Sequence, residues 1–128
     1  IIVCNPPFFI NSTKKPELNR TLARHCETLS HEDLLQVSDN LLLPEGKLCV
    51  ILPVNEAKHF IELTQGEKWF VNKLSTVYPT PDKAPKRQLI ELSKVKKHFV
   101  EDSITLEIER HILHESYANL TKDFYLKL

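Results

Sequence analysis

The tetrapeptide Asn5-Pro6-Pro7-Phe8 carries groups that could hold a planar chemical group bearing an NH2. Pro6 favours an extended backbone at Asn5. Neither proline has an N–H to donate, so the carbonyls of Asn5 and Pro6 remain available as acceptors in a stiff loop. The side chain of Asn5 adds one acceptor and two donors, and Phe8 adds a flat apolar ring. The chemistry of this stretch is therefore that of an amine-binding loop.

The element that must position this loop is the apolar run over residues 1–4, which directly precedes it. The run is short, continuous and β-branched, which predicts a buried strand. Two adjacent prolines would also suit a plain turn that ends a strand. The interpretation as a binding site therefore depends on the whole tetrapeptide and on its position after the strand.

A helix followed by a second apolar strand predicts a parallel βαβ unit behind the loop. Ser30 and Asp33 resemble a capping box at the start of the helix, Pro44 and Gly46 end it, and the strand covers residues 47–52. The apolar stripe of the helix, which we expect in the core with no cofactor role, consists of Leu34, Leu35, Val37, Leu41 and Leu42.

The rest of the chain predicts further strands and helices with the periods typical of an α/β protein. In order, we expect a helix capped by Asn55 and ending near Gly66, a strand over residues 69–78 near a sheet edge, a proline-rich loop over 79–85, a strand over 87–93 antiparallel to its predecessor, a half-buried edge strand over 104–108 and a short helix over 118–122.

Composition is that of one ordinary folded domain. The chain has 128 residues, of which 41% are hydrophobic and 27% charged. No apolar run is long enough for a membrane span, and no signal-peptide pattern opens the chain, so we expect a cytoplasmic protein. With 17 basic and 17 acidic residues the formal net charge is zero, which excludes a whole-chain field that attracts nucleic acid.

Positive charge is nevertheless concentrated in two local patches. Such patches suit phosphate contacts, but a solvated surface has the same composition, and the sequence leaves both readings open. The patches are Lys14, Lys15, Arg20 and Arg24 in the first, and Lys83, Lys86, Arg87, Lys94, Lys96 and Lys97 in the second.

A metal site is not expected. His25, Cys26 and His31 could suggest zinc, but no fourth ligand stands at a typical spacing. Cys4 and Cys49 lie inside apolar runs and suit buried thiols in a reducing compartment.

The tetrapeptide resembles the Asn/Asp-Pro-Pro-Tyr/Phe signature of class I S-adenosylmethionine-dependent amino-methyltransferases. The resemblance implies a Rossmann-like, doubly wound α/β sheet, in which the motif ends the fourth strand and parallel strands are followed by a reversed antiparallel strand. It implies that the Asn5 side chain and the Pro6 carbonyl accept hydrogen bonds from the target amine, with Asn5 at the junction of cofactor and substrate, and that Phe8 stacks on the base. The catalytic candidates are Asn5, Pro6, Pro7 and Phe8.

Two further stretches resemble bacterial tRNA (adenine-N6)-methyltransferases in particular: the triplet over residues 23–25 and the C-terminal segment over 120–128. This resemblance implies tRNA as the partner and the exocyclic amine of an adenine in the anticodon loop, at position 37, as the target. The residues alone favour Phe124, Tyr125 and Leu126 as anchors of the C-terminus. The tentative RNA-binding candidates are Lys14, Lys15, Arg20, Arg24 and His25.

The resemblance covers only the second half of that family's catalytic domain. Members bind S-adenosylmethionine with a Gly-rich loop, but no G-x-G occurs here, and Gly46 and Gly66 stand at predicted helix ends. We therefore expect residues 1–128 to be the C-terminal part of the domain, without its upstream cofactor-binding half and inactive alone. Its first strand would then expose an unpaired edge that invites self-association.

Three alternatives remain from the sequence. The motif also serves enzymes that methylate guanine-N2 in rRNA or glutamine in release factors, although the triplet and the C-terminal segment favour the tRNA enzyme. The third alternative is a non-catalytic RNA-binding remnant.

Overall fold

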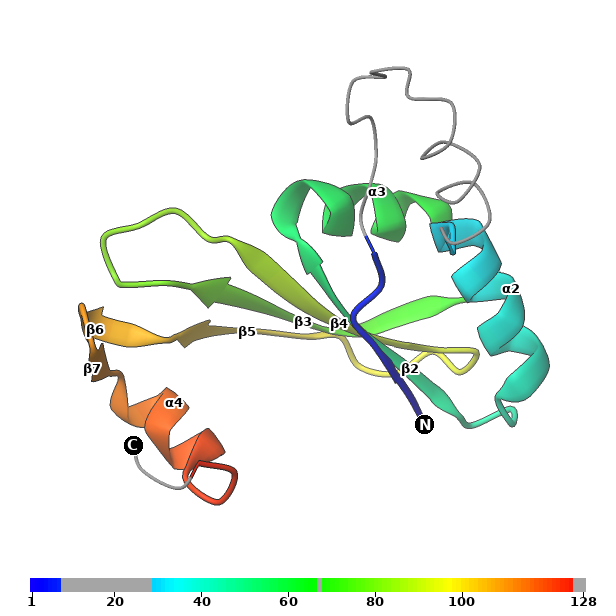
Figure 1. Cartoon of the computed structure of the whole chain (residues 1–128). Helices are drawn as coiled ribbons and strands as arrows, with labels where there is room; N and C mark the ends of the chain where they lie inside the picture. Colours follow the sequence, from blue (N-terminus) through cyan, green and yellow to red (C-terminus); the bar gives the residue numbers. More distant parts are fainter. Residues whose placement is uncertain (8–28, 67, 126–128) are drawn as a thin grey trace, which may run out of the picture.

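The computed structural model describes residues 1–7, 29–66 and 68–125, and these ranges contain a five-stranded mixed sheet with two helices packed on one face (Figure 1). The strand order is β1-β2-β4-β3-β5, and a two-stranded sheet of β6 and β7 lies at the far end from β1. In chain order the elements are β1 (Ile2–Cys4), α2 (His31–Leu41), β2 (Lys47–Pro53), α3 (Val54–Leu63), β3 (Phe70–Tyr78), β4 (Arg87–Ser93), β5 (Val100–Thr105), β6 (Glu107–Glu109), β7 (Ile112–Leu113) and α4 (Glu115–Thr121).

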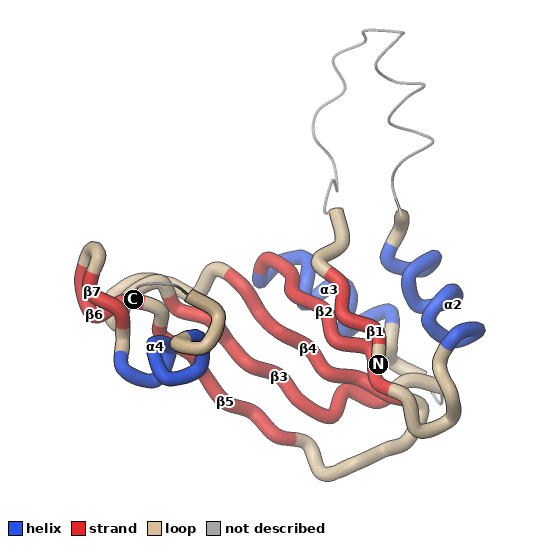
Figure 2. The backbone as a smooth tube through the Cα atoms, turned by 60° about the horizontal axis from the view of Figure 1, so that its bottom comes forward, coloured by secondary structure: helices blue, strands red, loops and turns tan. Residues whose placement is uncertain are grey.

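Strand directions create one functional edge of the sheet. β1 is parallel to β2, and β4 is antiparallel to both β2 and β3, while β5 is parallel to β3. The carboxyl ends of β1, β2, β3 and β5 therefore lie along one side, here named the carboxyl edge (Figure 2). The α/β class and the reversed strand are confirmed. Residues 69–78, expected nearer an edge, form β3, which lies one strand in from the edge because β5 pairs along its outer side.

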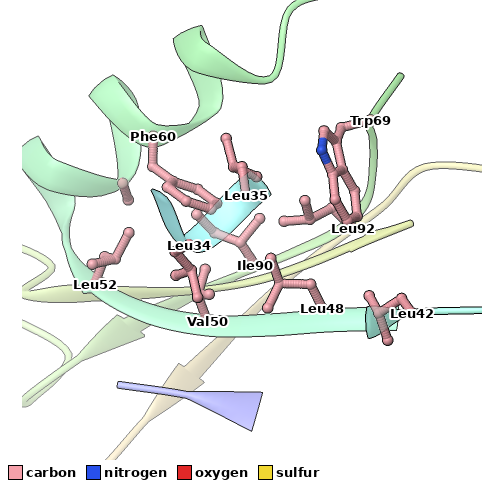
Figure 3. Close-up of a cluster of buried hydrophobic side chains, with 11 residues drawn as sticks. Leu34, Leu35, Leu42, Leu48, Val50, Leu52, Phe60, Trp69, Ile90 and Leu92 are labelled. Atoms are coloured by element: carbon pink, nitrogen blue, oxygen red, sulfur yellow. The ribbon is translucent and has the colours of Figure 1, made fainter. Parts of the chain in front are cut away.

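The core lies between the sheet and the helices α2 and α3 (Figure 3). Alternate residues of β2 face the helices, and Phe60 of α3 is fully buried above them. Burying a side chain of this kind stabilises the fold by about 1.5–3 kcal/mol. The core consists of Leu34, Leu35, Leu42, Leu48, Val50, Leu52, Ala57, Phe60, Trp69, Ile90 and Leu92.

Helix α2 begins with the predicted capping box. The Ser30 hydroxyl accepts from the Asp33 amide at 3.0 Å, and the Ser30 amide donates to the Asp33 carboxylate at 3.2 Å. The predicted apolar stripe is partly wrong, because Val37 and Leu41 are 47% and 71% exposed. The buried face follows residues 31, 34, 35 and 38 instead, and positions 37 and 41 lie beside that stripe on the helix surface.

Helix α3 starts directly at the end of β2. Pro53, with an extended backbone, occupies the N-cap position, so the expected capping by Asn55 is wrong: Asn55 lies within the first turn. Pro53 makes no capping hydrogen bond from its side chain, but it can occupy this position because its missing N–H would have no intrahelical partner. None of the helices in the described ranges is long and apolar enough to cross a membrane.

Strand β1 lies at the edge of the described sheet. Ile2 and Cys4 pack against the core, whereas Ile1 and Val3 are 81% and 76% exposed. The first strand is thus half-buried and not fully buried as expected. The thiols of Cys4 and Cys49 are also only partly buried, and this burial raises the pKa of both.

The chain after β5 differs most from expectation. The single strand predicted over residues 104–108 is divided: β5 ends at Thr105, where the Leu106 amide still donates to the Tyr78 carbonyl at 2.9 Å, and a second strand begins at Glu107. β6 and β7 follow, and α4 starts three residues earlier than residue 118, at Glu115. The His114 side chain caps α4 by accepting from the Ser116 amide.

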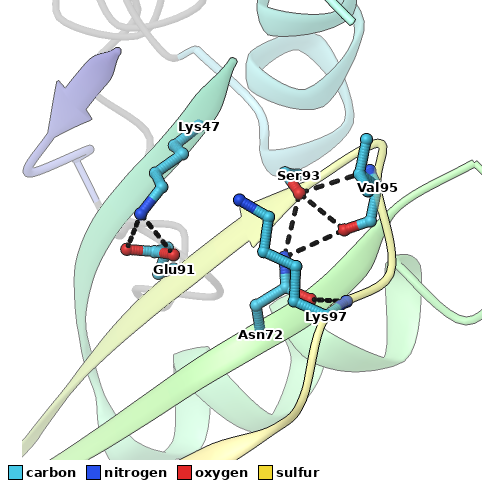
Figure 4. Close-up of polar contacts among 6 residues, drawn as sticks. All are labelled: Lys47, Asn72, Glu91, Ser93, Val95 and Lys97. Atoms are coloured by element: carbon cyan, nitrogen blue, oxygen red, sulfur yellow. Dashed lines mark hydrogen bonds and ion pairs between the residues drawn. The ribbon is translucent and has the colours of Figure 1, made fainter. Parts of the chain in front are cut away.

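A buried asparagine joins β3 to the connection between β4 and β5 (Figure 4). The Asn72 side chain donates to the Ser93 hydroxyl at 2.9 Å and to the Val95 carbonyl at 3.1 Å, and it accepts from the Lys97 amide at 2.9 Å. Asn72 is 4% exposed and stands where the register of β3 and β4 shifts. The bulge turns this polar side chain towards the Ser93 hydroxyl and backbone groups of the connection, and it gives the Lys97 amide an acceptor.

Candidate active site

The register of β1 and β2 sets the position of the predicted amine-binding loop, which follows β1. Cys4 pairs with Val50, so the chain leaves β1 at the carboxyl edge beside the last residues of β2. Pro6 is fully buried, whereas Asn5 and Pro7 are exposed. A buried proline with a fixed φ anchors the loop, and the exposed amide of Asn5 is accessible to a ligand. Of the four catalytic candidates, the structure thus describes three, and it presents Asn5 at an edge where ligands bind in open α/β sheets.

Other elements bring polar groups to the same edge. Arg87, at the start of the reversed strand β4, pairs with Pro53 at the end of β2. Glu56 lies in the first turn of α3 and buries its Oε2 atom without a hydrogen-bond partner among the described residues. Sequence reasoning did not single out Glu56. The sequence feature that could have indicated Glu56 is its place in the first turn of a helix that directly follows a strand ending at the carboxyl edge.

His31, the first residue of α2, is 6% exposed. Its ring makes an edge-to-face contact with Phe60, with ring centroids 5.3 Å apart, and lies 6.2 Å from the ring of His59. Burial lowers the pKa of His31, and the negative charge of Glu56 partly offsets that effect. A neutral imidazole packed on an aromatic ring is a core residue. Within the described ranges no group of three potential ligands could hold a metal ion.

The remaining predicted contacts with substrate fall outside the described residues. These are Phe8, Lys14, Lys15, Arg20, Arg24 and His25, and the first basic patch and its proposed roles therefore stay predictions.

The second basic patch is divided by the fold. Lys83, Lys86 and Arg87 lie in or after the loop between β3 and β4, at the carboxyl edge. Lys94 lies at the opposite edge, where it donates to the carbonyls of Asp39 and Leu42 at 2.8 and 3.1 Å. Lys94 therefore satisfies the last carbonyls of α2, and only the first part of the patch is placed for contact with a substrate at Asn5.

The two glycines do not form a cradle for a cofactor. A Cβ at Gly46 would lie 2.8 Å from Leu42 Cδ2, so this glycine allows close packing between α2 and β2, whereas a Cβ at Gly66 would meet no atom within 4 Å. A dinucleotide- or nucleoside-binding loop needs backbone close to the ligand. The described residues do not fit the full binding site of S-adenosylmethionine, although Asn5 can border one.

Comparison with known proteins finds relatives that match this chain over its whole length. No family model matches it. It is 45% identical over its whole length to the tRNA1(Val) (adenine(37)-N6)-methyltransferase of Parabacteroides distasonis, covering 54% of that protein. Proteins of the same name from Trichodesmium erythraeum and Pectobacterium carotovorum are 42% and 37% identical over 99% and 98% of the chain, which covers 53% and 51% of them. The chain thus spans about half the length of the curated relatives it matches.

A solved structure confirms the fold. A predicted O-methyltransferase from Agrobacterium tumefaciens aligns with a TM-score of 0.62 at 16% sequence identity, over 72% of this chain and 45% of that one. At this identity the likeness concerns the fold alone.

Proposed function

We propose that this chain supplies the amine-binding part of a tRNA1(Val) (adenine-N6)-methyltransferase. The proposal starts from its similarity, over its whole length, to proteins of that name. The reaction is methyl transfer from S-adenosylmethionine to the N6 amine of adenine 37 in a tRNA. The observation that carries the proposal is the buried Pro6 beside an exposed Asn5 at the carboxyl edge.

The chemical task of Asn5 and Pro6 is to activate a weak nucleophile. The lone pair of an exocyclic amine is delocalised into the adenine ring. Two acceptors that bind the amine hydrogens, the Asn5 Oδ1 atom and the Pro6 carbonyl, favour a more tetrahedral and more positively charged nitrogen. Because that charge develops only in the transition state, these bonds lower the barrier more than they strengthen binding of the ground state. No general base is needed before methyl transfer, and Phe8 stacks on the unstacked base.

The cofactor supplies the electrophilic methyl group. Because the described residues offer no glycine cradle, we place its main binding loop in the part of the relatives that this chain does not match. Residues 1–128 then correspond to the C-terminal part of the catalytic domain, and Asn5 borders the methyl donor.

The RNA would approach along the carboxyl edge. Lys83 and Lys86 lie in the loop at this edge and suit phosphate contacts, as do the candidates of the first basic patch, Lys14, Lys15, Arg20, Arg24 and His25. A tRNA substrate places the protein in the cytoplasm.

The test is a chimera in which this chain replaces the matching segment of the Parabacteroides distasonis relative. Methyl transfer to tRNA1(Val) is compared for the chimera, Asn5→Ala and Asn40→Ala, whose asparagine lies exposed on α2. Asn5→Ala should lower kcat by about 100-fold or more, as expected for the loss of one preorganised group at a developing charge. Asn40→Ala should retain the parent rate.

An Asn5→Ala chimera as active as the parent would contradict the proposal. Asn5→Asp provides a finer comparison, because it keeps an acceptor at the same position and should retain part of the activity that Asn5→Ala loses. A folded chimera that methylates no tRNA would reject the whole function.

A further inference from the structure

We propose that a cavity at the carboxyl edge, beyond the end of β3, binds a nucleobase of the substrate RNA other than the target adenine, one that bears an exocyclic amino group. The identity of the RNA rests on the proposed function above. The cavity has a volume of about 570 Å³, within the range of pockets that hold small molecules. It is lined by Pro79, Leu106, Glu107, His111, Leu113, Tyr117 and Tyr125.

The position of this cavity follows from backbone hydrogen bonds at the end of β3. The Leu106 amide donates to Tyr78 at 2.9 Å, and the Glu107 amide donates to Pro79 at 3.0 Å. The cavity therefore opens beyond the carboxyl end of β3. β2 and β4 separate β3 from β1, and three inter-strand spacings correspond to about 14 Å. The cavity and Asn5 can thus contact one RNA molecule, but not one nucleotide.

The walls of the cavity suit a flat ring. Tyr117 of α4 is half-buried, and Pro79, Leu106 and Leu113 add apolar surface. A hydrogen bond between the Tyr117 and Tyr125 side chains raises the pKa of Tyr117, so its ring stays neutral at physiological pH. Stacking on tyrosine is a common way for proteins to hold the unstacked bases of single-stranded RNA loops.

The polar groups of the cavity select among bases. The carboxylate of Glu107, when ionised, only accepts hydrogen bonds, so it matches the amino group of adenine, cytosine or guanine and not the carbonyl at the same place in uracil. Cations stand outside: Arg110 donates to the His111 ring at 3.1 Å, and the loop with Lys83 and Lys86 follows Pro79. Glu107 lines the cavity and these cations do not, which fits an amino-bearing base whose phosphate remains outside.

The turn that carries His111 is held in a costly conformation. His111 has a φ of 69°, and among the described residues it is the only one other than glycine with a positive φ. A residue in this region costs free energy that the surrounding structure must offset. The turn joins β6 to β7 and places the imidazole at the cavity, as expected for a backbone held to present a side chain.

The direct test uses nucleotides and needs no methyl transfer. Isotope-labelled protein is titrated with cytidine 5′-monophosphate, uridine 5′-monophosphate and ribose 5-phosphate while NMR follows the Tyr117 ring and the Leu113 methyl groups. We expect saturable shifts with the cytidine nucleotide, weaker shifts with the uridine nucleotide and none with ribose 5-phosphate. Equal shifts with ribose 5-phosphate would show phosphate binding alone, and no shift at millimolar cytidine nucleotide would equally overturn the proposal.

Three variants separate stacking, the hydroxyl and the carboxylate. Tyr117→Leu should weaken binding of the cytidine nucleotide about tenfold or more, as stacking on an aromatic ring contributes per base, and Tyr117→Phe should stay near the parent. Glu107→Gln keeps the size of the side chain and should remove the preference for cytidine over uridine. If the spectrum of Tyr117→Leu shows an unfolded C-terminal segment, Glu107→Gln decides, and an unchanged preference would overturn the proposal.

The chimera adds a readout that separates this inference from the function it rests on. Tyr117→Leu should raise KM for an anticodon stem-loop RNA about tenfold with kcat unchanged, and unchanged KM would contradict the pocket. If the chimera is inactive but the 128-residue chain still binds the cytidine nucleotide at Tyr117, the methyltransferase proposal is rejected. The proposal of a base-binding pocket is then retained.

Discussion

Two regions of this chain are built in different ways: the layered region over residues 30–93 and the C-terminal region over residues 94–125. All the buried hydrophobic residues that the structure describes lie in the layered region. In the C-terminal region β5 attaches by parallel pairing with β3, and α4 buries no residue. The layered region is stabilised by side-chain burial and the C-terminal region mainly by backbone hydrogen bonds. We therefore expect the C-terminal region to open locally at a lower free energy than the layered region.

This difference matters for the site. Pro6 is fully buried and anchors the motif on the layered region. A firm anchor suits a group that must be positioned accurately against a reacting nitrogen. The cavity beyond the end of β3 is lined mainly by the C-terminal region, whose weaker packing can adapt to a base. The proposed reacting groups thus lie on the tightly packed region, and the proposed base-binding cavity lies on the weakly packed one.

The largest loss of stability is expected from a substitution in the layered region. Phe60→Ala should destabilise the protein by about 3–5 kcal/mol, because a fully buried ring is removed and leaves a cavity. Leu113→Ala in the C-terminal region should cost about 1 kcal/mol or less, because Leu113 is only half-buried. Urea unfolding measures both. Equal losses of unfolding free energy would break the comparison.

An intermediate effect is expected where the two regions meet. Asn72→Ala removes the acceptor of the Lys97 amide and the donor to the buried Ser93 hydroxyl, while the Val95 carbonyl still accepts from Ser93. We expect a cost of about 0.5–1.5 kcal/mol for each hydrogen bond lost. Amide exchange at Lys97 should accelerate in this variant. Asn119→Ala, at an exposed position of α4, is the matched control and should change neither quantity. Unchanged protection at Lys97 would mean that another contact holds this connection.

The smallest effect is expected from pH and Asp39. Hydrogen bonds from Lys68 and then Lys94 lower the pKa of Asp39, although burial opposes them. A carboxylate whose pKa is lower in the folded state adds stability above its unfolded pKa of about 3.9, and this stability is lost as pH falls through the folded value. Asp39→Asn should therefore flatten the decline of the urea midpoint below about pH 4, compared with the parent and with Glu45→Gln. Parallel curves for Asp39→Asn and the parent would show that the lysines add no pH-dependent stability.

Local patterns predicted much of the layered region. The capping box of Ser30 and Asp33 formed because both groups lie within one turn, and the strands of residues 47–53 and 87–93 follow from runs of apolar residues. The narrower stripe of α2 and the interior position of β3 were not predictable, since both depend on which elements pack beside them. The division of the strand predicted over residues 104–108 was also missed, because β5 pairs with β3 while β6 pairs with β7, and the local pattern does not encode these pairings.

The sequence alone predicted the chemistry proposed for the tetrapeptide Asn5-Pro6-Pro7-Phe8, because the restrictions that Pro6 and Pro7 impose on the backbone act within a few residues. It also determined the α/β class, because hydrophobic period is a local property. Only the tertiary structure decided that Pro6 is buried while Asn5 is exposed, that the second basic patch is divided between two edges, and that Tyr117 and Glu107 line one cavity. Those outcomes depend on strand pairing between distant segments, and local residue types do not encode which strands become neighbours.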